Sequence, residues 1–230
     1  MKVLIVITNV ERTKRSGLAT GFHFAEFSHA YEFFIDHGYD VTVASPNGGK
    51  CTITSDYPGD KINAAFKANE SRMRLIEQTR CIADIKEEDF DAVYVAGGHG
   101  AMFDLAYNPD LASVINLCYE SNGVVASVCH GPAGLIGVET ADGEFLVQDK
   151  RVTSFTNKEE KATDFYDEMP FLLETELTKQ GAIFEQSDPR TPHLTIASRI
   201  VTGQNPESIE LVLGAIHAQL VTQPVEILAQ

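Results

Sequence analysis

The sequence predicts an α/β domain with a mostly parallel central sheet that is covered by helices on both faces. Short apolar, β-branched runs at residues 3–7, 92–96 and 123–128 have the composition of strands buried on both sides. Helical spacing over residues 21–36 separates the first run from another strand at 41–44, which gives a β-α-β unit of the kind that builds parallel sheets. With 230 residues, 43% of them hydrophobic, the chain can bury a large core without disulfides.

In the first half of the chain, the helix over residues 21–36 is followed by Gly38, which suits a helix C-cap. The strand at 41–44 runs into turn residues at 46–49. Residues 50–88 are more polar. We expect short helices there that form a cap or a small insertion.

In the second half, the strand at 92–96 ends in a Gly-Gly-His-Gly turn, and a helix is expected over residues 110–120. The strand at 123–128 ends in Cys-His-Gly-Pro, whose proline suits the first turn of a following helix. An amphipathic helix from about residue 206 reaches residue 220. Four further strands are expected between these helices, at residues 151–155, 182–185, 194–197 and 200–202.

Charge and composition exclude several functional classes. Acidic residues outnumber basic ones 33 to 18, for a net charge of −15, so the protein repels nucleic-acid backbones and anionic membrane surfaces. The four cysteines form no CxxC pair, which disfavours a zinc ribbon or a dithiol redox site. The apolar run at the N-terminus is too short for a signal peptide and no run is long enough to span a membrane. We expect one cytoplasmic domain over residues 1–230, with the insertion at 50–88.

Cys129 lies in a turn with the form of a nucleophile elbow. Such a turn places the nucleophile between a strand and a helix, with small residues two positions before and after it, as Ser127 and Gly131 are here. The helix N-terminus and His130 both favour a thiolate at Cys129, and His130 is also a candidate base. The other three cysteines, Cys51, Cys81 and Cys118, are expected to be structural.

The Gly-Gly-His-Gly turn lies at the end of a neighbouring parallel strand, where ligands bind in such sheets. The backbone N–H groups of Gly98 and His130 could form an oxyanion hole, with Gly97 and His99 in the substrate pocket. The alternative is a tight loop that needs positive φ. The spacing is not GxGxxG, so dinucleotide binding is disfavoured.

Glu26 is an unusual residue on the apolar side of the first helix. Phe22 and Ala30 are four residues away on either side, which places its carboxylate on the buried stripe. Burial would raise its pKa and make it an acid or base beside Cys129. The alternatives are a glutamate at the stripe edge that reaches solvent, or a metal site with His23 and His29, which the spacing around the helix disfavours.

These motifs together resemble the ThiJ/PfpI superfamily, whose fold is that of the class I glutamine amidotransferases. The resemblance covers nearly the whole chain and rests on the helical Glu26, the Gly-Gly-His-Gly turn at 97–100, the Cys-His-Gly-Pro turn at 129–132 and residues 151–157. Within the superfamily, the Phe-Asp pair at 103–104 is similar to the heat-shock chaperone class, which includes glutathione-independent glyoxalases of the glyoxalase III type.

The resemblance implies a flavodoxin-like three-layer α/β/α sandwich, a homodimer and a Cys-His-acid triad with an additional glutamate. Cys129, His130 and Glu26 match directly. The third acid is expected shortly after the Phe-Thr pair at 155–156, where Glu160 matches better than Glu159. It would orient His130. Both glutamates could instead occupy a solvated first helical turn.

The class implies conversion of methylglyoxal, or a related 2-oxoaldehyde, to D-lactate or the matching 2-hydroxy acid through a Cys129 hemithioacetal. This chemistry needs neither a metal nor an organic cofactor, since the substrate carries its own electron sink. Alternatives on the same turn are a cysteine hydrolase (a peptidase or a protein deglycase) and a redox sensor. A stress chaperone that holds unfolded client proteins is an alternative of a different class.

Overall fold

A seven-stranded sheet forms the centre of the molecule, whose computed structural model describes residues 1–57 and 59–222. Its strand order is β10-β11-β7-β6-β1-β3-β5. Every neighbouring pair is parallel except β10 and β11 at one edge. The strands are β1 (Lys2–Val6), β3 (Asp40–Ser45), β5 (Arg80–Cys81), β6 (Ala92–Val95), β7 (Val124–Val128), β10 (Leu194–Ala197) and β11 (Ile200–Gly203).

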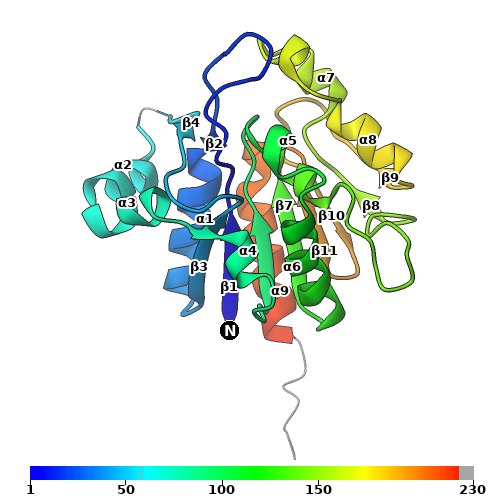
Figure 1. The fold of residues 1–230 in the computed structure, drawn as a ribbon, viewed down its shortest axis with the longest axis horizontal. Coiled ribbons are helices and arrows are strands. Elements are labelled where there is room, and N and C mark those ends of the chain that lie inside the picture. Colours follow the sequence, from blue (N-terminus) through cyan, green and yellow to red (C-terminus); the bar gives the residue numbers. More distant parts are fainter. Residues whose placement is uncertain (58, 223–230) are drawn as a thin grey trace, which may run out of the picture.

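Helices cover both faces of this sheet (Figure 1). Val3 and Ile5 of β1 pack into a core on one face, while Leu4 and Val6 pack into a second core on the other, so the strand is apolar from Val3 to Val6. The first core includes α1 (Phe24–Asp36) and α9 (Ile209–Thr222), with α2 (Lys61–Ala68) and α3 (Glu70–Glu77) outside α1. The second includes α4 (Ile82–Ile85), α5 (Ala101–Asp104), α6 (Pro109–Glu120) and α8 (Leu173–Lys179). The predicted three-layer, mostly parallel α/β sandwich is confirmed.

Several short elements lie outside the central sheet. Two small parallel sheets pair β2 (Phe22–His23) with β4 (Ile53–Thr54), and β8 (Arg151–Val152) with β9 (Ile183–Phe184). The remaining helical segments are η1 (Gly131–Leu135), α7 (Asn157–Glu160), η2 (Tyr166–Glu168) and η3 (Pro206–Ser208).

The structure differs from the expected elements in three places. Residues 50–88 do carry short helices, but they also supply β5 to the edge of the central sheet. The expected strands at 151–155 and 182–185 shrink to β8 and β9 outside that sheet, and the N–H of Thr153 turns aside to the Thr202 hydroxyl. The segment after Cys129 is a five-residue 3-10 helix with Pro132 in its first turn, and its two glycines disfavour a regular α-helix.

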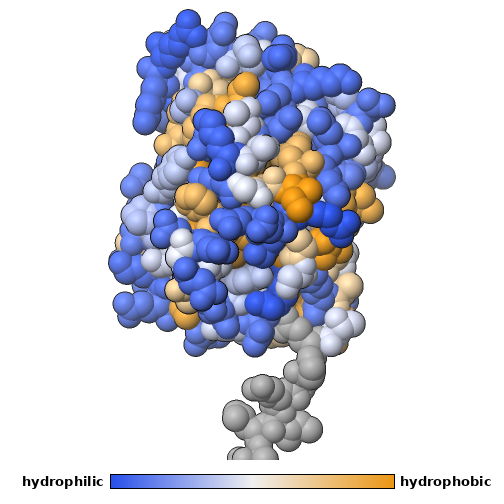
Figure 2. All heavy atoms as spheres, turned by 90° about the vertical axis from the view of Figure 1, so that its right-hand side faces the viewer, coloured by the Kyte–Doolittle hydropathy of each residue, from blue (hydrophilic) through white to orange (hydrophobic). Residues whose placement is uncertain are grey.

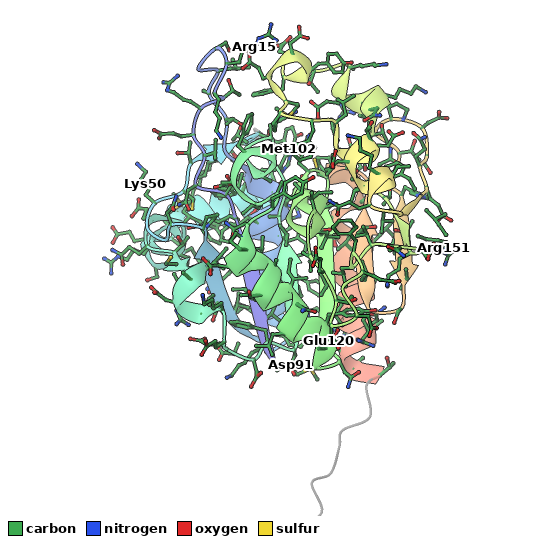
Figure 3. All side chains as sticks on the ribbon, turned by 45° about the vertical axis from the view of Figure 1, so that its right-hand side comes forward. Arg15, Lys50, Asp91, Met102, Glu120 and Arg151 are labelled. Atoms are coloured by element: carbon green, nitrogen blue, oxygen red, sulfur yellow. The ribbon has the colours of Figure 1, made fainter. Side chains whose placement is uncertain are left out.

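The loop between β1 and β2 rises above the carboxyl edge of the sheet. Arg15 lies at its tip, whereas Asp91 and Glu120 lie at the opposite edge (Figure 3). The face of the molecule that carries α7 and α8 is mostly hydrophilic (Figure 2), as expected from the acidic composition. Among the residues described, no helix is long and apolar enough to cross a membrane.

Candidate active site

Cys129 occupies a sharp turn directly after β7, with its backbone at φ +60°. A left-handed conformation is uncommon for a residue with a side chain and is typical of a nucleophile elbow. The small residue two positions later is needed, since a Cβ on Gly131 would lie 2.2 Å from the Val95 carbonyl oxygen. The turn is held by hydrogen bonds from the Cys129 N–H to Gly203 and from the Phe155 N–H to Cys129.

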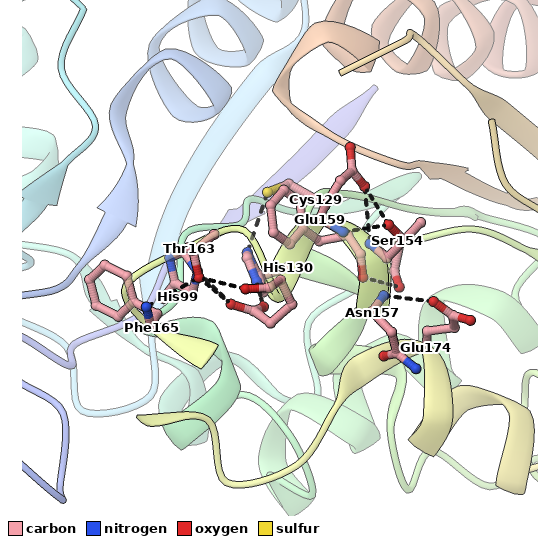
Figure 4. A network of polar contacts seen from close by, with 12 residues as sticks. His99, Cys129, His130, Ser154, Asn157, Glu159, Thr163, Phe165 and Glu174 are labelled. Atoms are coloured by element: carbon pink, nitrogen blue, oxygen red, sulfur yellow. Dashed lines mark hydrogen bonds and ion pairs between the residues drawn. The ribbon is translucent and has the colours of Figure 1, made fainter. Parts of the chain in front are cut away.

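His130 connects the thiol to a carboxylate. Its Nδ1 lies 3.4 Å from Cys129 Sγ, and its Nε2 lies 2.6 Å from Glu160 Oε2 (Figure 4). Burial would raise the pKa of Glu160, but the charge and hydrogen bonds of His130 and the hydrogen bond of His99 outweigh it and hold the pKa well below its usual range. An ionised Glu160 fixes the Nε2–H tautomer of His130 and leaves Nδ1 facing the sulfur.

Glu159, the other candidate for this role, points away from His130. It forms the capping box of α7 with Thr156, and its carboxylate also accepts from the Arg190 N–H and from the side-chain amides of Gln204 and Asn205. The Thr-x-x-Glu pattern at 156–159 is a capping-box signature. It could have assigned Glu159 to the helix cap from the sequence alone.

Glu26 lies in the first turn of α1 with none of its side chain exposed. Its Oε2 accepts the Gly97 N–H at 2.6 Å, while Oε1 has no hydrogen-bond partner among the described residues. Burial raises the pKa of Glu26 to about 8, although hydrogen bonds from Gly97 and Cys129 oppose the rise. The carboxyl group beside Cys129 is therefore protonated at neutral pH.

The Cys129 thiol itself does not have the lowered pKa that the sequence suggested. Burial raises it well above the usual value, and the nearby Glu26 raises it further, while the N–H groups of His130 and Gly98 act in the opposite direction. The helix N-terminus expected to favour the thiolate is only the short η1. Glu26 acts through its charge and through a hydrogen bond with the thiol, and only the charge contribution disappears while that carboxyl holds its proton.

Two backbone amides point toward the sulfur. The N–H groups of Gly98 and His130 both hydrogen-bond to Cys129, and neither donates to a backbone carbonyl among the residues described. Gly98 has φ +97°, and a Cβ there would lie 2.5 Å from the Gly21 carbonyl oxygen, so the close approach requires glycine. These are the amides expected to bind an oxyanion.

The two other residues predicted from the glycine turn, Gly97 and His99, have different contacts. Gly97 packs against Glu26, and a Cβ on it would lie 2.7 Å from both Glu26 Oε2 and the His130 nitrogen. His99 Nε2 lies 3.0 Å from Glu160 Oε1, and its ring stacks on Phe165 at 4.1 Å. That His99 contacts the substrate stays a prediction.

Sequence reasoning considered His23 only as a possible metal ligand and did not place Tyr57 or Arg190 near the site. His23 caps α1, accepts the Glu26 N–H through Nδ1, and has its pKa lowered to about 3 by burial and by the nearby histidines. Its Nε2 lies 3.3 Å from the Tyr57 hydroxyl. A hollow of about 290 Å³ lies beside the site, and its lining includes Tyr57, Phe155 and Arg190. The Phe155 ring is 4.5 Å from that of His130.

The residues once considered for a metal do not converge. His29 pairs with Asp60 at 2.8 Å, away from His23 and Glu26. Among the described residues, His99, His130 and Glu160 have donor atoms close enough to hold an ion, but these atoms already bind one another.

Fold and site together define a cysteine-centred α/β protein, with the thiol, a histidine and two amides at the carboxyl ends of adjacent parallel strands. Residues 17–217 match the DJ-1/PfpI family, and the chain belongs to that family.

Several similar proteins have names that describe them as glyoxalases. The chain is 29% identical to "Glyoxalase 3" of Candida albicans over 90% of its own length and 93% of that protein. It is 32% identical to a glutathione-independent glyoxalase of Schizosaccharomyces pombe, covering 84% of each chain. Among solved structures, the Francisella tularensis rapid encystment protein is similar with a TM-score of 0.91, at 34% identity over 96% of this chain and 99% of that one. The Candida albicans glyoxalase III structure has a TM-score of 0.88, at 28% identity over 95% and 97% of the two chains.

Proposed function

We propose that this protein is a glutathione-independent glyoxalase that converts methylglyoxal, or a related 2-oxoaldehyde, to D-lactate or the matching 2-hydroxy acid. The glyoxalase relatives, which the chain covers almost completely, support this function. The observation that carries the proposal is a protonated, buried carboxyl at Glu26 beside a thiol that also faces a histidine base.

The reaction begins with attack of the Cys129 sulfur on the aldehyde carbon. The thiol proton passes to His130 Nδ1, 3.4 Å away, as the carbon–sulfur bond forms. The N–H groups of Gly98 and His130 stabilise the negative oxygen. His130 then returns the proton to this oxygen, which gives a neutral hemithioacetal and regenerates the base.

Isomerisation then moves hydrogen from C1 to C2. His130 removes the C1 proton while the Glu26 carboxyl donates its proton to the C2 oxygen, which gives an enediol. His130 delivers its proton to C2 and Glu26 regains one from the C1 oxygen, so the product is a thioester at Cys129. Water activated by His130 hydrolyses the thioester, releases the hydroxy acid and restores the thiol.

Lactate formation from methylglyoxal tests this proposal. Cys129→Ala should reduce turnover by about 10³-fold or more, since the covalent route is lost. Cys118→Ala is the matched control because that thiol belongs to α6, is buried and lies outside the site. Undiminished lactate production by Cys129→Ala would refute the assignment. Cleavage of a chromogenic peptide without turnover of methylglyoxal would favour the hydrolase alternative instead.

The redox-sensor alternative receives no support from the site. Oxidation to a sulfenic acid favours an accessible thiol with a low pKa, whereas Cys129 is 3% exposed and burial raises its pKa. A homodimer, client binding as a chaperone and a single catalytic domain over residues 1–230 stay predictions. Light scattering on the full chain would test the first.

A further inference from the structure

Glu160 binds two histidines, one on each carboxylate oxygen. Oε2 lies 2.6 Å from His130 Nε2, and Oε1 lies 3.0 Å from His99 Nε2 (Figure 4). The Thr163 hydroxyl adds a hydrogen bond to Oε1 at 3.0 Å. A triad needs only the contact with His130, so the second histidine requires its own explanation.

Packing holds the His99 ring in one orientation. It stacks on Phe165 with an interplanar angle of 15°, and its centroid is 4.2 Å from that of His130. Phe155 meets it edge-on at 6.1 Å. The His99 side chain is 17% exposed, and its Nε2 is already engaged by Glu160. An aromatic ring fixed on these sides can aim a single N–H at a chosen acceptor.

The groups of this cluster differ in charge: Glu160 is ionised, whereas the His99 ring is neutral. Burial and, to a smaller extent, the neighbouring His130 lower the pKa of His99 to about 4, although Glu160 opposes the shift. His99 is therefore a neutral ring at neutral pH. Because a carboxylate only accepts hydrogen bonds, the proton of this ring lies on Nε2. The titratable groups that face His99 are His130 and Glu160, and His99 in turn acts on His23.

We propose that His99 is a positioning residue for the reaction: its Nε2–H holds the outer oxygen of Glu160, so that the inner oxygen stays aimed at His130. This inference rests on the proposed glyoxalase function. His99 acts through Glu160 and not by touching the reacting atoms. It leaves His130 as the only histidine of the pair that exchanges protons with substrate.

Removing this donor has two physical consequences. The carboxylate loses a hydrogen bond to its charged form, becomes more basic and attracts the His130 proton more strongly. It also gains rotational freedom, so His130 Nδ1 is less well aimed at the sulfur. The first effect moves the acid limb of the pH–rate profile to higher pH, and the second lowers kcat.

Two variants of His99 separate the hydrogen bond from the packing. His99→Phe keeps a flat ring against Phe165 but has no donor, whereas His99→Gln keeps an N–H donor at similar reach. With methylglyoxal, His99→Phe should lower kcat about tenfold, leave KM within about twofold, and move the acid limb up by about 0.5–1 pH unit. His99→Gln should restore the position of the limb. Thermal unfolding checks that both variants fold, and His99→Leu, which also lacks a donor, replaces the phenylalanine variant if it does not.

A measurement without substrate distinguishes this inference from the proposed function. Nuclear magnetic resonance of isotope-labelled histidine rings follows the titration of His130 directly. We expect its midpoint to rise in His99→Phe and to stay near the wild-type value in His99→Gln. An unchanged midpoint in His99→Phe, or an equal rise in His99→Gln, would overturn the positioning role. A wild-type protein that makes no lactate refutes the glyoxalase function, while the ring titration still decides the role of His99.

Discussion

Replacing Glu26 by glutamine should stabilise the folded protein at neutral pH while reducing its activity. The Glu26 side chain is fully buried, and burial raises its pKa from 4.5 to about 8. In the folded state it holds a proton at neutral pH, but in the unfolded chain it is ionised. The folded state binds more protons over this range, so its stability falls as pH rises from about 4.5 to about 8.

The magnitude follows from the pKa difference. At about pH 7 the difference between 7 and 4.5 is 2.5 units, which corresponds to a cost of about 3 kcal/mol at 1.36 kcal/mol per unit. Glutamine cannot ionise, and its amide oxygen can still accept the Gly97 N–H that Glu26 accepts at 2.6 Å. The variant escapes the pH-dependent cost but cannot donate a proton to substrate.

Urea unfolding of wild type and Glu26→Gln at about pH 5 and about pH 8 measures this effect. The stability difference in favour of the variant should grow by about 3 kcal/mol between the two pH values. Tyr94→Phe is the matched control: the Tyr94 hydroxyl donates to the Glu26 carbonyl at 2.9 Å and does not titrate in this range. A difference between Glu26→Gln and wild type that is the same at both pH values would refute the reasoning.

Three other substitutions or treatments test separate parts of the site. Glu159→Ala should destabilise the protein by about 3–5 kcal/mol in urea unfolding. The substitution removes the acceptor of hydrogen bonds from Thr156, Arg190 and Asn205. A loss of stability below about 1 kcal/mol would contradict this. Gly97→Ala should reduce kcat at least 100-fold, since its Cβ would lie 2.7 Å from Glu26 Oε2; near-normal kcat would show that the carboxyl moves freely. Cys118 should resist iodoacetamide in the folded protein at about pH 8, because burial raises the pKa of its thiol to about 12; mass spectrometry that finds it modified before global unfolding would disprove its burial.

Much of the fold was predictable because the strands that carry the site are buried on both faces. The runs that contain β1, β6 and β7 are mostly apolar and β-branched, and this pattern leaves few alternatives to a parallel sheet. The expected strands at 151–155 and 182–185 contain β8 and β9 but are too long, since two residues of pairing leave no periodicity to detect. The edge strand β5 was missed for the same reason.

The candidate site was also predictable only in part. The placement of Cys129, His130 and Glu26 follows from local turns and helix spacing, which sequence can show. The thiol pKa could not be predicted, because its main cause is burial by segments distant in sequence. The stacking of Phe165 on His99 is equally non-local, and 66 positions separate the two residues.

The loop between β1 and β2 also determines when the site can assemble. Near its tip, the Thr13 hydroxyl donates to Glu168 at 2.6 Å and the Arg15 guanidinium donates to the Asp167 carbonyl, across more than 150 residues of sequence. These contacts anchor η2, which directly follows Phe165. Synthesis proceeds from the N-terminus, so a growing chain exposes the Cys129 thiol before the segment that supplies Glu160 and its cover exists. Closing so long a loop comes late in folding, so His130 beside the Cys129 thiol gains Glu160 and its cover only after that later segment has been made.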